Sequence, residues 1–410
     1  MNPVLFAAHQ NATIHQRSNQ TVKPQPFNAQ TSMTFRTHVE FFLLCLALNL
    51  SGGARITFGA DNRAGAVERF DRLVIPAVEA AVRKSGTNLG GNIAWGQAYQ
   101  LAALVEMFDA THDPKHAALI VKLGDWIADA RDSRHNFRDE VRDRIMPGWG
   151  SSGYSKGQRY VWAVHTGVVA APLARFAAIV RHDPALTNRW GAAASRLLKV
   201  AEEAVAAHDD EYREGPQPDE GHVYCPYLKK QLPLNMQNAL AEAWLAVDDA
   251  TQTPKHRERI TRLAQFLKNR LRPMDDGAYV WAYWPALEGV TESFENISHA
   301  AINVDFMVRC FEHGLVFQQT DLTRLEKTLL GRVLVANDRI SDTVGGGGKV
   351  NTHRSAVLRW GRLARYSPEV HDRLAPFSEL PEFAHDATSL PVGIVYLNLP
   401  PPEPSKPAGK

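Results

Sequence analysis

The chain has 410 residues, of which 44% are hydrophobic and 22% charged, so it carries enough apolar side chains to bury a large core. Forty-six basic residues against forty-four acidic ones leave a net charge of +2, and no Lys/Arg block stands out. This composition excludes a chain that is disordered throughout and argues against nucleic acid as a partner.

The first 54 residues have the composition of a processed N-terminus. Residues 1–32 are polar and aperiodic, which predicts an extension that is disordered or untranslated. Residues 33–54 start at Met33, contain the apolar run 41–48 and end in small residues, as secretory signal peptides do. The run is too short to span a bilayer. We therefore expect a secreted or periplasmic protein without stable membrane insertion; the alternative is a buried hydrophobic helix.

Helical periodicity dominates the chain from Ala64 onward. Apolar residues recur at i, i+3, i+4 and i+7 between Gly, Pro and Asn/Asp clusters, which predicts at least ten helices. The predicted helices are 64–84, 93–110, 115–131, 158–181, 187–207, 235–250, 254–271, 298–313, 321–336 and 353–366. The weak alternation over 277–284 predicts a short hairpin or an ordered loop. A Pro-rich tail is expected over 396–410, after a single domain over 60–395.

The helices come in pairs. Residues 109–116 and 249–256 share one turn pattern, with a similar turn at 181–184, so the repeat is about 70 residues. Helical hairpins of this kind must stack to bury their apolar faces. The connections between pairs are long, which favours a closed ring with one elaborated face over an open solenoid. The all-α architecture of five to six hairpins resembles the α/α toroids of carbohydrate-active enzymes, at the level of fold only.

Five of the predicted helices follow long connections and begin with polar or aromatic residues. If these helices form the inner ring, their starts meet at one cavity, where amide, imidazole and guanidinium groups can bind hydroxyls and carboxylates. The candidates are Trp95, Gln97, Tyr99, Tyr160, His165, Asn235, Gln237, Asn238, His299, His353 and Arg354. The simpler interpretation of Asn235 is a helix cap, and His165 fits a satisfied core histidine equally well.

Two loops add aromatic residues near the same end. Trp149 and Tyr154 lie in a Gly-rich stretch, and Trp281 and Tyr283 lie in a loop that leads to Glu292. Aromatic rings beside acids can bind polysaccharide, but such rings can also pack the loop beneath the ring. The spacing of His, Cys and acidic residues matches no metal motif, so no metal or other cofactor is expected. The sequence leaves open whether Cys225 and Cys310 form a disulfide.

These candidates favour a lyase that cleaves a uronic-acid-containing polysaccharide by β-elimination. That reaction needs a group that neutralises the uronate, a base for the C5 proton and an acid for the leaving oxygen. Resemblance to toroid lyases implies an Asn or Arg neutraliser, here Asn235 or Arg354. It also implies a His base and a Tyr acid, for which His165, His299 and Tyr160 are available.

Three alternatives remain. A glycoside hydrolase needs two carboxyl groups facing the cleft, and we expect only Asp305 on an inner helix, with Glu292 and Glu295 nearby. A uronate C5-epimerase would use nearly the same residues as a lyase. A non-catalytic sugar-binding or scaffold protein would retain the aromatic and amide residues without a proton-transfer pair. The expected partner is an acidic polysaccharide or oligosaccharide, and the sequence specifies no oligomeric state.

Overall fold

The computed structural model describes residues 60–84, 86–285, 293–336, 339–347 and 353–399. The extension expected over 1–32, the signal peptide expected over 33–54, Glu292 and residues 400–410 lie outside these ranges. The residues from Ile56 onward form one unit, and all helices described below belong to it.

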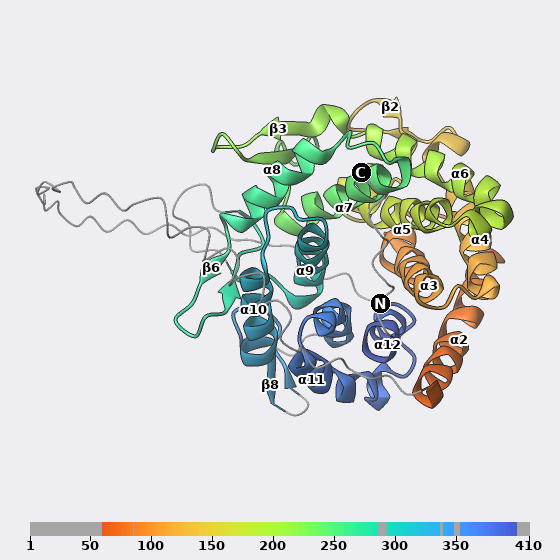
Figure 1. Cartoon of the computed structure of the whole chain (residues 1–410). Coiled ribbons are helices and arrows are strands. Elements are labelled where there is room, and N and C mark those ends of the chain that lie inside the picture. Colours follow the sequence, from red (N-terminus) through yellow and green to blue (C-terminus); the bar gives the residue numbers. More distant parts are fainter. Residues whose placement is uncertain (1–59, 85, 286–292, 337–338, 348–352, 400–410) are drawn as a thin grey trace, which may run out of the picture. The chain divides into compact units, whose positions relative to one another are not determined.

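Six helices line the inside of a ring (Figure 1). These inner helices are α3 (Ala98–Thr111), α5 (Ala163–His182), α7 (Leu234–Thr251), α9 (Ile297–Glu312), the 3₁₀ helix η5 (Arg354–Arg365) and α12 (Leu390–Asn398). Each packs against the next, and α12 packs against α3, so the ring is closed. A π-helical turn, η1 (Ile93–Gln97), leads into α3.

Six further helices cover the outside of the ring, each with an apolar face toward its inner partner. They are α2 (Ala60–Val82), α4 (Pro114–Asp129), α6 (Pro184–Ala206), α8 (Arg257–Lys268), α10 (Gln319–Thr328) and α11 (Pro368–Ser378). The turn η4 (Leu329–Val333) extends α10. Because α2 packs against α12, the two ends of the described chain complete the last hairpin. The expected all-α toroid of helical hairpins is confirmed.

Short turns join each inner helix to the outer helix that follows. The turn after α3 begins with His112 in the left-handed conformation (φ 53°), and Asp113 then caps α4 by accepting the Lys115 N–H at 2.9 Å. The turn after α7 also begins left-handed, at Gln252 (φ 56°). The two repeated turns therefore begin alike, but α8 starts at Arg257, three residues later in the repeat than α4. Because short turns follow the first five inner helices, these helices run parallel, with their N-terminal ends together.

The long connections lie at that N-terminal end and carry small antiparallel sheets. The strands are β1 (Arg138–Asp139) and β2 (Arg144–Ile145); β3 (Tyr212–Glu214), β4 (Gly221–Cys225) and β5 (Lys230–Gln231); β6 (Arg272–Pro273) and β7 (Tyr279–Val280); β8 (Leu334–Ala336) and β9 (Arg339–Ile340). The 3₁₀ turns η2 (Asp132–Arg134), η3 (Asp209–Glu211) and η6 (Pro381–Phe383) complete these connections. The hairpin expected near 277–284 is present, because β7 pairs with β6.

Helices α11 and α12 have no counterpart among the helices expected from periodicity. Every residue of α12 from Leu390 to Leu397 is buried, so it has no polar face to produce a helical period. Helix α11 has a helical pattern, since its buried Val370, Leu374 and Phe377 lie at i, i+4 and i+7, but it is only 11 residues long and contains Pro376. The boundary expected at residue 396 also lies too early, because Tyr396 is buried inside the ring.

A single buried carboxylate connects five of the six inner helices. Glu106 of α3 accepts from Arg309 of α9 at 3.1 Å and from the Tyr396 hydroxyl of α12 at 3.0 Å. It also pairs with Arg175 of α5 at 2.8 Å and with Arg362 of η5. Burial alone would raise the pKa of Glu106, but the surrounding guanidinium groups outweigh burial and hold that pKa well below its usual range.

The sequence leaves undecided whether Cys225 and Cys310 form a disulfide, and in the structure both are free thiols. Cys225 and Cys310 are both buried, and neither forms a disulfide. Helix α5 is apolar and long enough to cross a bilayer, but most of its surface is buried against its neighbours. Its apolar composition is therefore that of a core helix.

Helices α5 and α7 pack closely against each other, and Gly167 permits this. A Cβ on Gly167 would collide with the backbone of Ala239 and lie 2.5 Å from Leu240 N. No side-chain rearrangement can relieve a collision with backbone atoms. The small residue is therefore required where the two helices cross.

We expect Gly167→Ala to destabilise the protein by about 1–3 kcal/mol, because it forces α5 and α7 apart. Gly191→Ala is the matched control: a Cβ there meets only Thr187 Cγ2, at 3.4 Å, and alanine favours helix by about 0.5–1 kcal/mol. Urea unfolding of both variants measures the difference. Equal stability of the two variants would show that the helices do not cross at Gly167.

Candidate functional site

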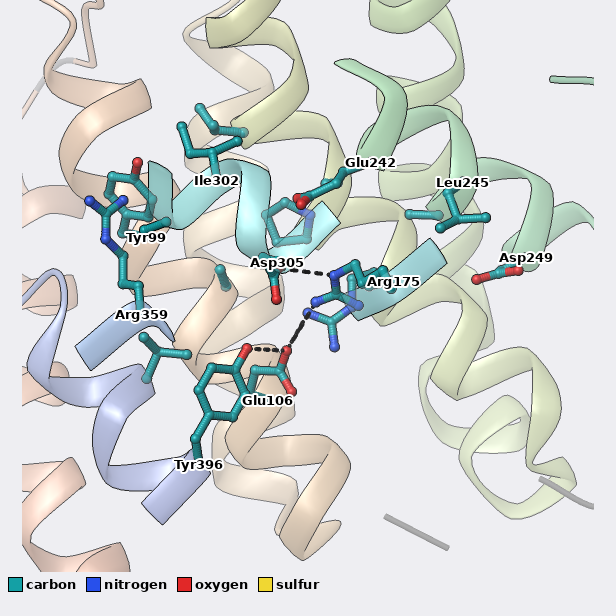
Figure 2. Close-up of a pocket in the computed structure, with 18 of the residues that line it drawn as sticks. Tyr99, Glu106, Arg175, Glu242, Leu245, Asp249, Ile302, Asp305, Arg359 and Tyr396 are labelled. Carbon is teal, nitrogen blue, oxygen red and sulfur yellow. Dashed lines mark hydrogen bonds and ion pairs between the residues drawn. The ribbon is translucent and has the colours of Figure 1, made fainter. Parts of the chain in front are cut away.

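A cavity of about 120 Å³ lies inside the ring, with room for several water molecules (Figure 2). Tyr99, Ile302 and Arg359 line it toward the N-terminal ends of the inner helices. Deeper residues include Glu106, Glu242 and Asp305. We call the N-terminal end of the ring, formed by the first turns of the inner helices, the mouth.

Arg359 places a positive charge at the mouth. Its guanidinium lies over the Tyr99 ring, 4.4 Å from the centroid, and Nη2 donates to the Ser298 carbonyl at 3.1 Å. Its Nε and Nη1 atoms are buried and have no hydrogen-bond partner. Among the residues that the structure describes, no carboxylate forms an ion pair with it. A partly buried guanidinium in this state favours an anionic ligand.

His299 lies beside this guanidinium, on the first turn of α9. Its ring packs against Tyr283 with 5.1 Å between centroids. Burial, reinforced by the charges of Arg359 and His353, lowers the pKa of His299 to about 4. The imidazole is therefore neutral near pH 7 and can accept a proton. Burial also raises the pKa of Tyr283, whose hydroxyl stays protonated.

A second cluster surrounds His165 on α5. The rings of Trp95 and Tyr154 pack on it edge-on, at 5.2 and 5.6 Å. Asn88 Oδ1 accepts from the Ala94 N–H, so its Nδ2 is the donor that faces His165 Nδ1 at 3.1 Å. Burial lowers the pKa of His165 to about 3. The neutral ring therefore carries its proton on Nε2 and serves as a donor rather than a base.

Asn235 is buried in the first turn of α7, and neither its Oδ1 nor its Nδ2 has a hydrogen-bond partner. It lies two helical turns before Glu242, on the face of α7 that lines the cavity. Asn238 Nδ2 donates to Asn303 Oδ1 at 2.7 Å, and Asn303 Nδ2 donates to Glu295 Oε2 at 2.6 Å. An amide chain thus joins α7 to α9 below the mouth.

Several expected site residues have structural partners instead. The Trp149 indole is fully buried and donates to the Ile127 carbonyl, and the Tyr160 hydroxyl contacts Arg142 and Cys225. Trp281 is buried against Trp360 and donates to Glu295. All three aromatics are buried packing residues, and for Trp281 this agrees with the alternative that its loop is packed by its own aromatics.

The remaining candidate residues either bond to other groups of the protein or are at least partly exposed. Gln237 is buried, and its Oε1 accepts from the Val223 N–H at 3.1 Å. Arg354 pairs with Glu382 at 3.1 Å. His353 is exposed at the start of η5, and Gln97 is half-buried on η1. The structure thus gathers Trp95, Tyr99, Tyr154, His165, Tyr283 and His299 at the mouth, together with Arg359, which the sequence reasoning missed.

The expectation that only Asp305 would be an acid on an inner helix is wrong. Glu242 also lines the cavity. Burial and the Asp305 charge raise the pKa of Glu242, whereas Arg309 and Arg362 outweigh burial and lower the pKa of Asp305. Glu242 was not among the predicted site residues because these were chosen at helix starts, whereas Glu242 lies two turns into α7. An isolated acid within an otherwise apolar helix was the available signal.

Glu295 is another acid without a cation. It is fully buried just before α9, where Trp281 and Asn303 donate to Oε2 while Oε1 has no partner. Burial outweighs these hydrogen bonds and raises its pKa to about 8. In the described part of the chain, no three His, Cys, Asp or Glu side chains gather closely enough to hold a metal ion.

Solved structures share the ring. The α-1,6-mannanase GH76A of Salegentibacter sp. HEL1_6 matches with 12% identity over 82% of this chain and 98% of that chain, with a TM-score of 0.51. Its inactive double Asp-to-Asn variant, in complex with α-1,6-mannotriose, matches with 11% identity over the same shares and a TM-score of 0.52. No protein-family model and no curated protein matches the sequence.

A third structure, the unsaturated glucuronyl hydrolase of Streptococcus agalactiae, has 10% identity and a TM-score of 0.47, covering 83% of this chain and 80% of that chain. The likeness to the mannanase confirms the expected resemblance to α/α-toroid carbohydrate-active enzymes at the level of fold.

The raised pKa of Glu295 predicts a pH-dependent contribution to stability. The neutral carboxyl is native, so its contribution is complete below the ordinary pKa of 4.5 and is lost as pH rises toward about 8. Glu295→Gln stays neutral, so the melting temperature of the wild type should fall relative to this variant between pH 5 and pH 8. The control is Glu258→Gln, whose side chain is 78% exposed. A difference that does not change with pH would contradict the assignment.

Proposed function

We propose that this chain is a carbohydrate-active enzyme that binds an acidic saccharide at the mouth and cleaves it by β-elimination. The observation that carries the proposal is the Arg359 guanidinium, which lines the cavity without an acidic partner among the described residues and lies beside a neutral histidine. A uronate carboxylate has the charge and the planar shape that a guanidinium binds best.

The surroundings of Arg359 support an anionic sugar as the ligand. The inner helices direct their N-terminal ends, and thus the positive ends of their dipoles, toward the mouth. Trp95 and Tyr99 stack there with 6.4 Å between centroids, and partly exposed aromatic rings of this kind pack on the apolar faces of sugars. A toroid of the same fold, the mannanase variant, binds mannotriose.

Each step of the proposed reaction has a candidate group. Arg359 pairs with the uronate carboxylate and stabilises the charge that develops when the C5 proton leaves. His299 takes that proton, and Tyr283 gives its hydroxyl proton to the departing glycosidic oxygen. The C5–H and C4–O bonds break while a C4–C5 double bond forms. A bound carboxylate offsets the Arg359 charge, which raises the basicity of His299 in the complex.

A glycoside hydrolase is the second candidate, because Glu242 and Asp305 line one cavity with opposite pKa shifts, as an acid and a carboxylate would. The arrangement favours it less: Arg309 donates to Asp305 Oδ2 at 3.0 Å and Arg362 to Oδ1, so neither oxygen is free to attack. Secretion or periplasmic location, expected from residues 33–54, fits a polymeric substrate and remains part of the proposal.

Arg359→Gln should lower kcat/KM on the cleaved polysaccharide by about 100-fold or more, because it removes the charge that neutralises the uronate. Arg354→Gln is the control. Arg354 lies on the same helix as Arg359 but pairs with Glu382, so this substitution should change kcat/KM little. The assay is ultraviolet absorbance of the unsaturated uronate, with alginate, glucuronan and glycosaminoglycans as substrates.

Other outcomes of that assay identify the alternatives. New reducing ends without ultraviolet absorbance, abolished by Glu242→Gln, would establish a hydrolase. Solvent deuterium entering C5 without cleavage would establish an epimerase. Binding without any of these reactions would leave a sugar-binding protein and refute the enzymatic proposal.

The lowered pKa of His299 predicts an unusual pH profile. A base must be neutral to act, so activity should be lost as pH falls through about 4 instead of through the ordinary histidine value of 6.5. The profile of kcat/KM between pH 3.5 and pH 8 reports this ionisation in the free enzyme. A midpoint near 6.5 on the acid limb would rule out a buried His299 as the base.

A further inference from the structure

The aromatic contacts of the mouth continue beyond His299 to Trp284 and Lys230, which we call the rim. Tyr283 packs on His299, and the next residue, Trp284, lies edge-on to Tyr283 with 5.7 Å between centroids. The Lys230 ammonium lies over the Trp284 ring, 3.7 Å from its centroid. A series of contacts therefore runs from His299, whose neighbour Ser298 accepts a hydrogen bond from Arg359, to the exposed Lys230.

The local fold holds this rim segment in place. The Tyr283 carbonyl accepts from the Leu234 N–H of α7 at 3.3 Å, which ties the loop after β7 to the start of α7. Lys230 lies on β5, in the same long connection that enters α7, and β5 is paired with β4 at two positions. Both partners thus belong to segments whose backbones are hydrogen-bonded to their neighbours.

Lys230 carries a charge that no described carboxylate neutralises. Its side chain is exposed, and its ammonium contacts the face of the indole but forms no hydrogen bond with a described residue. A cation held over an aromatic ring keeps its outward N–H groups available while the ring restricts its position. An ammonium presented in this way suits a carboxylate or sulfate on a sugar unit.

We propose that Lys230 and Trp284 form a second saccharide subsite, which binds a further acidic sugar unit of a polymer already held at Arg359. This inference rests on the proposed function, because it takes the ligand at Arg359 to be an acidic saccharide. The substrate class it specifies is a polyanionic chain with charges on more than one unit. Short uronates occupy the cavity alone, whereas longer chains reach the rim.

The test compares oligo-uronates of different length by titration calorimetry. Lys230→Gln should weaken binding of a hexasaccharide about three- to tenfold and leave binding of a disaccharide unchanged within twofold. Lys229→Gln is the matched control, since the neighbouring lysine is also exposed but does not lie over the indole. Trp284→Leu should reproduce the length-dependent loss, because it removes the ring that holds the ammonium.

Binding and cleavage are measured separately, so the two proposals fail in different ways. Equal loss for both lengths in the Lys230 variant, or no loss at either, would overturn the rim subsite while leaving the cavity site intact. Length-dependent loss without any cleavage by the wild type would support the subsite and remove the enzymatic claim. Absence of binding to any acidic oligosaccharide would overturn both.

Discussion

The ring depends on keeping one carboxylate ionised at its centre. Glu106 is almost fully buried and is held charged by guanidinium groups from three other inner helices. Buried ion pairs add little stability compared with apolar packing, but removing one partner costs about 3–5 kcal/mol because the others are left unpaired. These ion pairs therefore favour one inward face for each of the five inner helices that they join, and so influence which residues reach the mouth.

The same helix η5 provides arginines of two kinds. Arg362 and Arg365 both form ion pairs with Glu106. Arg359, one turn closer to the mouth, packs on Tyr99 and pairs with no described acid. A fold that neutralises its deep charges and leaves one near its opening uncompensated is suited to an anionic ligand. Our proposal of proton abstraction rests on the neutral His299 beside that charge.

Helical periodicity and turn repeats were sufficient to predict the ring, because each hairpin has one apolar face and can bury it only by stacking. Helix α12 escaped prediction because burial on all sides removes the period. At the site, helix starts selected His299, which the structure places beside Arg359, but they selected Arg354 and not Arg359 itself. Sequence spacing gives the face of a side chain, whereas its ion-pair partner comes from a distant segment, as Glu382 does for Arg354.

A crystal structure with a bound acidic oligosaccharide tests the central claim most directly. The account predicts a sugar carboxylate within hydrogen-bond distance of the Arg359 guanidinium, at the Nε and Nη1 atoms that now lack partners, with the sugar ring beside His299. A saccharide bound elsewhere on the ring, with Arg359 still unpaired, would contradict it.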